Sequence, residues 1–449
     1  MRALARHPAP FVPASLRRTA GLMAGLLLCL LLAAPPCRAQ ALGPDDIALL
    51  FPPAPHDAGT AAGVTVDSRA RPLYAPRGVR LGLLEAHPHI DLGFGFDSNP
   101  TGLPGGRGGA ILRIAPSLVL GTGWGGDRVG LYLGLDNRQV LGVALADRTD
   151  WTTAAGLRLR AGADRLRLTV ASQALHEDGS EVGALPTDRP LAYRITALRA
   201  AWRFGRARLT LSPALGFAAW RYAAASLGGL AVSEAYRNRD VAQAALTTRY
   251  ALASRSDLVL VLRGTDTHYV AAPPGAPSRD STGVAVLAGI EGGDGILQLR
   301  LLAGWEERRF AAAVYGSHAA PITEAQLVWT PAGMTTVTTT LSRRIEDAAT
   351  EGVAGFTATA ARLRIDHEAR RNLLLSLSAG VETAQFTEGG GHETGTELGA
   401  SLTWLLNRRL RVTAAERFTA LHGAAAVGAA AGSGSVSRSL SLLTLGLGL

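Results

Sequence analysis

The chain has 449 residues, a formal net charge of +9 and a charged fraction of only 18%, below the about 25% of an ordinary soluble protein. Hydrophobic residues make up 47%, which excludes an intrinsically disordered chain. The two Cys exclude both a disulfide scaffold and a Cys-rich zinc module. The sequence contains no Lys, so every basic charge except those of His comes from Arg.

The first forty residues have the pattern of a secretory signal peptide. Four Arg precede an uncharged apolar run from Gly21 to Ala34. This run is shorter than the about 20 residues that a membrane helix needs, and it has the length of the apolar core of a signal. Small residues at Ala39 and Ala41 predict cleavage at one of these positions, and we assign residues 1–41 to the signal. The alternative is an N-terminal anchor that stays attached.

Cleavage changes the charge and the cysteine content. Residues 1–41 contain five Arg and no acidic residue, so the mature chain keeps 40 Arg against 36 acidic residues, a charge of +4. So small a charge predicts no nucleic-acid partner. Both Cys lie in the signal, and a mature chain without Cys suits an oxidising compartment.

The mature sequence alternates between apolar and polar or Gly positions, which is the pattern of half-buried strands. Clear examples are residues 88–96, 128–135, 165–170, 373–382 and 443–449. We count about eighteen such segments, each roughly as long as the ~9–11 residues of a membrane strand or somewhat longer. No stretch of about 18 apolar residues follows Ala41, so transmembrane helices are not expected.

The connections between these segments alternate in length. Short turns near 123–127, 162–164, 205–206, 253–255, 292–295, 331–333, 370–372 and 407–408 alternate with longer loops near 98–108, 136–149, 177–191, 223–237, 270–280, 308–319, 347–355, 387–392 and 420–435. Short periplasmic turns and long external loops are typical of outer-membrane barrels. The sequence therefore predicts an all-β fold, a closed antiparallel up-and-down transmembrane β-barrel of about 18 strands (16–18).

The predicted organisation has three parts. Residues 1–41 form the signal peptide, residues 42–77 an extended Pro-rich periplasmic lead segment, and residues 78–449 the barrel in the outer membrane of a Gram-negative cell. Aromatic residues predict two girdles at the membrane interfaces. One set lies near short turns (Trp202, Phe204, Tyr250, Trp329, Trp404) and one near long loops (Trp151, Trp305, Tyr269). A soluble propeller or sandwich is the alternative, but no repeated blade motif is present.

Four sequence patches resemble a known family. The lead from Val66 to Gly82 has an R-x-R-P-x-Y-x-P-x-G pattern, and the tip Phe96–Pro100 reads F-D-S-N-P. The stretches Leu327–Thr336 and Asp366–Leu373 contain W-T-P and H-E-A-R-R-N-L. These patches resemble the family of outer-membrane β-barrel porins of type 2. The resemblance implies a barrel with porin activity, although this chain ends in Leu449 where many such barrels end in Phe or Trp.

The apolar alternation also predicts which charged side chains face the lumen. We expect the pore to be lined by Arg158, Arg160, Arg165, Arg167, Arg208, Arg249, Arg263, Arg300, Arg362, Arg364, Glu291, Asp366 and Glu382. Four of these Arg flank one short turn and predict a basic ladder at the periplasmic mouth (Arg158, Arg160, Arg165, Arg167). An Arg-lined lumen favours anions. The alternative, which the sequence favours, is that lumenal Arg and acidic residues pair and brace the wall.

The sequence has no pattern of an enzyme, a cofactor site or a metal site. Three His-Glu pairs begin at His176, His367 and His392, but none has the second His of a zinc protease motif. The Gly-rich stretch 102–109 has no following Lys and does not form a phosphate-binding loop.

We interpret the chain as a porin-like outer-membrane channel for small polar solutes, with a weak preference for anions. Its expected partners are outer-membrane lipids, the outer-membrane insertion machinery and its solute; the oligomeric state stays open. One alternative is a barrel that secretes an anionic exopolysaccharide. Another is a structural barrel whose lumen is plugged by loops such as 177–191 and 223–237.

Overall fold

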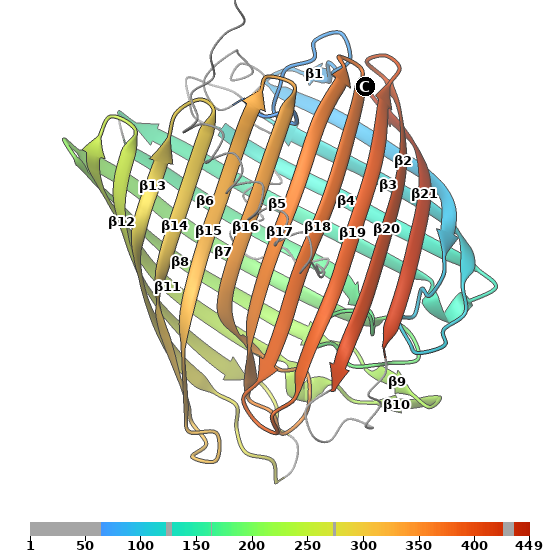
Figure 1. Cartoon of the computed structure of the whole chain (residues 1–449), viewed down its shortest axis with the longest axis vertical. Helices are drawn as coiled ribbons and strands as arrows, with labels where there is room; N and C mark the ends of the chain where they lie inside the picture. The colour runs from blue at the N-terminus through green and yellow to red at the C-terminus, as the bar shows by residue number, and fades with distance from the viewer. Residues whose placement is uncertain (1–63, 123–127, 163, 273–274, 425–434) are drawn as a thin grey trace, which may run out of the picture.

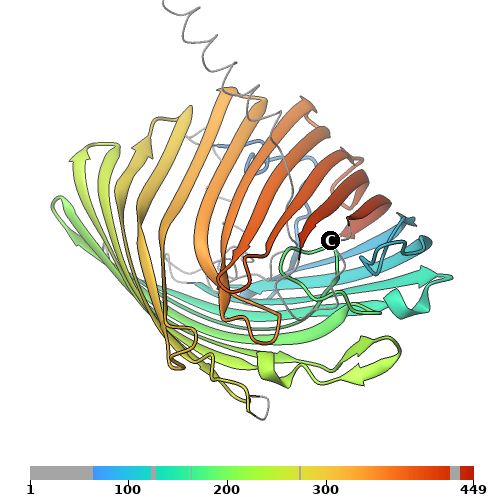
Figure 2. The ribbon, with the colours of Figure 1, turned by 60° about the horizontal axis from the view of Figure 1, so that its bottom comes forward.

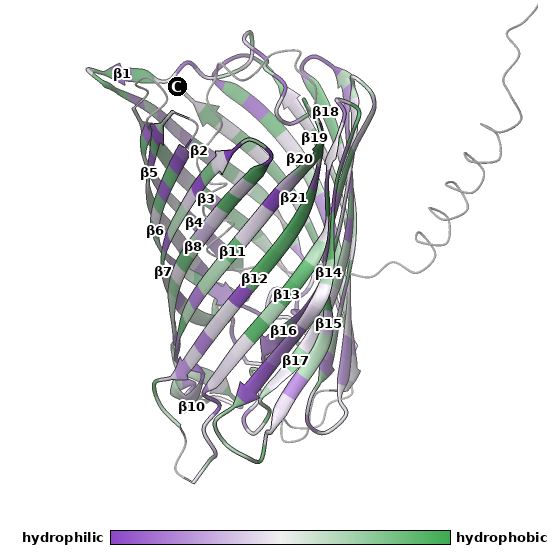
Figure 3. Cartoon of the chain, turned by 90° about the vertical axis from the view of Figure 1, so that its left-hand side faces the viewer, coloured by the Kyte–Doolittle hydropathy of each residue, from purple (hydrophilic) through white to green (hydrophobic). Residues whose placement is uncertain are grey.

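The computed structural model describes residues 64–122, 128–162, 164–272, 275–424 and 435–449. Within these ranges eighteen long strands form one closed antiparallel sheet (Figures 1 and 3). The strands are β2 (Leu84–Asp97), β3 (Gly109–Gly121), β4 (Arg128–Leu141), β5 (Arg148–Ala161), β6 (Asp164–Glu177), β7 (Leu191–Arg206), β8 (Leu209–Tyr222), β11 (Arg239–Ala253), β12 (Ser256–Tyr269), β13 (Ser281–Gly293), β14 (Leu297–Phe310), β15 (Ser317–Ala332), β16 (Thr335–Asp347), β17 (Gly355–Arg370), β18 (Leu373–Phe386), β19 (His392–Leu405), β20 (Leu410–Ala424) and β21 (Val436–Gly448).

Each long strand pairs with its neighbour in the chain, and β2 pairs with β21 to close the barrel. Closure leaves no free sheet edge, which lipid would penalise. The prediction of an all-β, closed up-and-down barrel of about 18 strands is confirmed. Among the described residues, five short elements lie outside the wall pattern: β1 (Val79–Leu81) beside β2, the hairpin of β9 (Ala225–Leu227) and β10 (Leu230–Val232), and two 3-10 turns, η3 (Ala144–Ala146) and η4 (Ala235–Arg237).

Alternation along each strand separates an apolar exterior from a mixed interior. In β13, Val284 and Val286 are 63% and 43% exposed on the outside, whereas Ala285 and Leu287 are buried on the inside. Figure 3 shows this alternation of hydropathy along the strands. An outward belt of Val, Leu, Ile and aromatic side chains is what a barrel presents to lipid.

The barrel interior also contains apolar packing. Figure 2 shows two walls of the barrel converging toward the side formed by β12 to β14. There a buried cluster joins four neighbouring strands: Val259, Val261, Ala285, Leu287, Leu302 and Ile322. A second inward cluster consists of Ala154, Ala171, Ala197 and Ala218 on β5 to β8. These clusters fill part of the lumen and leave the rest to charged side chains.

The aromatic residues predicted for the two girdles lie on the outer surface near the barrel ends, with one exception. Trp202 and Trp404 near short turns, and Trp305 near a long loop, are about half exposed to the outside (51%, 49% and 54%). The assignment of Tyr269 to an outer girdle is wrong. Tyr269 is 7% exposed because its position in β12 faces inward, where the guanidinium of Arg279 covers its ring at 4.4 Å.

The predicted signal peptide, residues 1–41, and residues 42–63 of the predicted lead lie outside the described residues. Among the residues that the structure describes, no helix has the length and apolar character to cross a membrane.

Candidate functional site: an Arg-rich cavity inside the barrel

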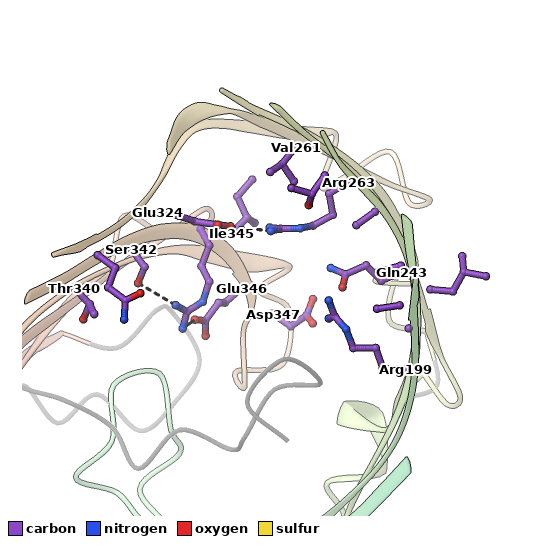
Figure 4. A pocket seen from close by; sticks show the side chains of 18 of the residues that line it. Arg199, Gln243, Val261, Arg263, Glu324, Thr340, Ser342, Ile345, Glu346 and Asp347 are labelled. Carbon is purple, nitrogen blue, oxygen red and sulfur yellow. Dashed lines mark hydrogen bonds and ion pairs between the residues drawn. The ribbon is translucent and has the colours of Figure 1, made fainter. Parts of the chain in front are cut away.

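A cavity of about 1120 Å³ lies inside the barrel between β6 and β17. Figure 4 shows side chains of two facing walls pointing into it, with Arg199, Gln243 and Arg263 on one wall and Glu324 on the other. The described lining contains five acidic residues (Glu177, Glu181, Glu324, Glu346, Asp347) and twelve Arg (Arg165, Arg167, Arg199, Arg203, Arg237, Arg239, Arg249, Arg263, Arg300, Arg308, Arg344, Arg362). The cavity is therefore strongly basic.

One wall of the cavity carries a chain of alternating charges. Arg249 and Arg300 both bind Glu291, at 3.2 and 2.8 Å. Arg263 binds Glu324 at 2.7 Å, and Arg300 also lies 3.7 Å from Glu324. The chain crosses the five strands from β11 to β15, so it braces this wall through charge-assisted hydrogen bonds.

Aromatic rings and Arg side chains occupy the loop-side end of the cavity. Tyr193 stacks against Trp220 and Tyr222, with ring centroids 6.0 and 5.4 Å apart. Arg237 lies 4.0 Å above the ring of Tyr222, and Arg239 lies 4.8 Å above the ring of Trp220. Arg–ring contacts of this kind favour a fixed side-chain geometry.

The connection between β16 and β17 folds into the barrel rather than away from it. Its residues Ala348, Ala349, Val353 and Ala354 are each less than 5% exposed. The Tyr236 hydroxyl donates to the Ala349 carbonyl at 2.9 Å, and Arg279 donates to the Ala348 carbonyl at 2.9 Å. These bonds tie three long loops together over the loop-side mouth.

A second loop, residues 178–190 between β6 and β7, crosses the lumen. The Gly183 amide donates to the carboxylate of Glu393 on β19 at 2.6 Å, although β6 and β19 are far apart in the barrel order. Val182 joins a buried cluster with Phe356 and Phe386 of β17 and β18. The loop thereby narrows the mouth on the side of the long connections.

A buried group of four charges holds the start of this loop, and we call it the loop lock (Asp97, Arg148, Asp178, Arg438). Arg438 binds Asp178 at 2.7 Å and Asp97 at 2.6 Å. Arg148 binds Asp178 at 3.3 Å. Asp97 and Asp178 are 1% and 4% exposed, so water cannot replace these partners. The F-D-S-N-P tip of the sequence supplies Asp97 and is thus part of the lock.

Protonation of Asp178 is expected to open the lock only in strong acid. Burial alone would raise the pKa of Asp178, but the guanidiniums of Arg438 and Arg148 outweigh it and hold this pKa well below its usual range. A carboxylate with a lowered pKa stabilises the fold above its unfolded-state pKa of about 3.9, and this contribution disappears as the pH falls through the lowered value. Hydrogen-exchange protection of residues 178–190 should therefore be equally strong at about pH 7 and at about pH 5, because the lock stays closed over this interval. Opening already in that interval would contradict this assignment.

The lead segment closes part of the opposite mouth. Arg71 and Arg69 bind Glu368 of β17 at 2.9 and 3.4 Å, and Glu368 is 2% exposed. The Val66 amide donates to the hydroxyl of Thr336 on β16 at 2.9 Å. We call this group the lead clamp (Val66, Arg69, Arg71, Thr336, Glu368). The R-x-R-P and H-E-A-R-R-N-L patches thus contact each other in the fold.

The structure distributes the predicted pore residues over several environments. Six of them line the cavity: Arg165, Arg167, Arg249, Arg263, Arg300 and Arg362. Arg158 and Arg160 sit directly opposite Arg167 and Arg165 across the β5–β6 pair. Glu291 belongs to the charge chain described above. Arg208 lies in the exposed turn between β7 and β8, outside the cavity lining.

The remaining predicted residues lie away from the cavity lining. Arg364 binds Asp366 on its own strand and Asp67 of the lead, the latter at 3.3 Å, so both strand residues belong to the lead side of the barrel. Glu382 of β18 is only 1% exposed. Within the described residues, no group of three or more His, Cys, Asp or Glu is placed to hold a metal ion.

Sequence reasoning missed several residues of the site. Arg199 and Arg203 alternate with the outward Leu198 and Trp202, so the pattern of β7 contained the signal for them. Other missed cavity residues stand near strand ends, where alternation is weakest (Arg239, Arg308, Arg344), or in η4 (Arg237). Asp178 carried no local signal, because its partners come from β5 and β21.

Several solved structures are similar to this chain. A search of curated proteins finds no match. Similar solved structures include OpdK of Pseudomonas aeruginosa (14% identity, TM-score 0.41, 81% of this chain and 98% of that chain), and OccK2 of the same organism in complex with glucuronate (14%, 0.44, 83% and 100%). The FrpB iron transporter of Neisseria meningitidis is another (9%, 0.42, 81% and 81%).

The family comparison is more specific. The matched region starts at Arg71 in the lead clamp and runs through the barrel to residue 430, which is most of the chain. The chain therefore belongs to the family described as "Putative beta-barrel porin 2", whose model matches residues 71–430.

Proposed function

We propose that this protein is an outer-membrane channel for small polar solutes and that its lumen prefers anions. The observation that carries the proposal is the charge of the cavity, which twelve Arg and five acidic residues line. Rings of Arg in a pore attract anions and repel cations. Even after each acidic residue of the lining neutralises one Arg, a positive excess remains.

The exterior of the barrel supports the location of this channel. Outward side chains such as Leu215, Val284 and Leu377 are 65%, 63% and 56% exposed. An apolar surface of this extent is favourable in contact with lipid and unfavourable in contact with water. The proposal includes export through the predicted signal, residues 1–41, and insertion with the short turns on the periplasmic side. The protein then acts as a transporter without catalytic chemistry.

Planar-bilayer recording of the refolded mature chain in a KCl gradient tests the proposal. We expect the zero-current potential to shift toward the chloride equilibrium potential, because the Arg excess raises the local chloride concentration. Replacing Arg203→Glu in the cavity should move this potential toward potassium. Arg194→Glu is the matched control, because Arg194 lies on the outward face of the same strand, beside Trp151. A potassium-selective wild-type channel would contradict the proposal.

The inward loops favour a second candidate, a structural barrel with a plugged lumen. The loop lock and the buried β16–β17 connection are the observations that support it. The two candidates differ in one result. A plugged structural barrel stays silent in bilayers even when the loop lock is removed, whereas a gated channel then conducts.

A further inference from the structure

Six Arg form two in-register rows on the inner face of β4 to β7, and we call them the Arg grid. In one row Arg158 of β5 pairs with Arg128 of β4 and with Arg167 of β6. In the other row Arg165 of β6 pairs with Arg160 of β5 and with Arg203 of β7. All six lie at the strand ends next to short turns. The grid is thus a compact patch of like charge.

Five of the six Arg in the grid differ from many other inward Arg of the barrel wall, because no carboxylate of the described residues pairs with them. Several other inward Arg bind acidic partners, as Arg263 binds Glu324 and Arg113 binds Asp136. Among the described residues no ion pair is formed by five members of the grid: Arg128, Arg158, Arg165, Arg167 and Arg203. Like charges directly opposite each other on neighbouring strands destabilise a sheet. Repulsion among these Arg therefore destabilises this part of the sheet, and a bound anion would offset the repulsion.

We propose that the Arg grid binds a compact solute that carries two or more oxyanionic groups. This inference rests on the proposed function, because the solute reaches the grid through the lumen. Neighbouring strands lie about 4.8 Å apart, and alternate residues of one strand about 6.7 Å apart. A single oxyanion engages one or two guanidiniums in fork geometry. A solute with several such groups spans both rows and neutralises more of them.

The position of the Arg grid fits a binding step during passage. Arg165, Arg167 and Arg203 line the basic cavity, so the grid opens directly into it. The lead clamp occupies the β16–β17 side of the same barrel end and leaves the β4–β7 side to the grid. A solute that moves between the cavity and the short-turn mouth along this wall contacts the grid.

Isothermal titration of the mature barrel in detergent tests the proposal with citrate and inorganic tripolyphosphate as multivalent probes and acetate as the monovalent one. We expect at least one multivalent probe to bind and acetate not to bind measurably. The variant R158Q/R167Q should weaken binding roughly a hundredfold, since each charged hydrogen-bond partner contributes about a factor of ten or more. Arg206→Gln is the matched control, because Arg206 ends β7 at the same barrel end but does not line the cavity.

A stability measurement separates binding from a structural role of these Arg. Without a probe, R158Q/R167Q should unfold at the same or a higher temperature than wild type, because it relieves repulsion. The bound probe should raise the unfolding temperature of wild type only. The variant R158K/R167K keeps the charge but loses the planar fork, and should bind between the two.

The possible results lead to distinct conclusions. Binding of citrate, tripolyphosphate or both that is lost in R158Q/R167Q supports the proposal, and the preferred probe tells carboxylates from phosphates. Absence of multivalent binding, unchanged binding in R158Q/R167Q, or a marked loss of stability in that variant overturns it. The titration needs no open pore. A cation-selective barrel that still binds citrate would therefore refute the proposed anion preference of the channel, but it would still support anion binding by the Arg grid.

Discussion

Replacing Asp178→Asn and Arg438→Gln together is expected to raise the open probability of the channel by about two orders of magnitude. Removing one partner from a buried charge cluster costs about 3–5 kcal/mol, and each 1.4 kcal/mol is about tenfold in a population. In the wild type, Arg438 binds both Asp178 and Asp97, and both carboxylates are almost completely buried. The double replacement removes this bridge, while the β-strands keep all their ladder hydrogen bonds. The free energy is lost where β2, β21 and residues 178–190 meet, because Asp97, which is 1% exposed, keeps its charge without Arg438.

Single-channel recording measures this effect as the fraction of time spent open at fixed voltage. The matched control is Asp240→Asn with Arg221→Gln, an ion pair at 2.6 Å whose side chains are 31% and 43% exposed on the outer surface. Exposed pairs contribute about 0–1 kcal/mol, so the control should gate like the wild type. An unchanged open probability in the lock variant, with the barrel correctly folded, would show that the loop does not gate the channel.

The fold was predictable because one physical rule applies to every residue of the wall. Lipid on one side and a polar lumen on the other impose an alternation of apolar and polar residues, so β13 and β21 can each be recognised from the sequence of the strand alone. Leu443, Leu445 and Leu447 are outward in the structure as their alternation indicates. Tyr269 failed the same rule, because an aromatic ring near a strand end also packs well under a loop Arg.

The clamps that narrow the barrel were not predictable from local patterns. Asp97 and Arg438 are 341 positions apart, and Arg71 and Glu368 are 297 apart. Only barrel closure, which places β2 beside β21, brings the first pair together. The lead had no periodicity, so nothing in residues 64–76 indicated that Arg71 enters the lumen. The resemblance patches were the one available signal, because two of them turn out to be in contact.

The second large effect is expected at the lead clamp. Glu368→Gln should release the lead from the mouth, because Arg69 and Arg71 then lose the carboxylate that both share. Arg71 has only 9% of its side chain exposed, so its unpaired charge cannot stay where it is. The expected shift toward the released lead is about a hundredfold, from the about 3–5 kcal/mol of a broken buried ion pair. An Arg-specific protease should then cleave after Arg69 faster than in the wild type, where the Arg69 side chain binds Glu368.

The lead and the loop lock should control different properties of the same channel. Releasing the lead should widen the short-turn mouth and raise the unitary conductance, whereas releasing the lock should change how often the other mouth opens. The sites lie at opposite barrel ends, so their effects should combine independently. The triple variant D178N/R438Q/E368Q should show both changes, and Glu307→Gln, which removes an exposed partner of Arg309 on the outer face, should show neither. If Glu368→Gln changed open probability instead of amplitude, the two mouths would be coupled through the wall that connects them.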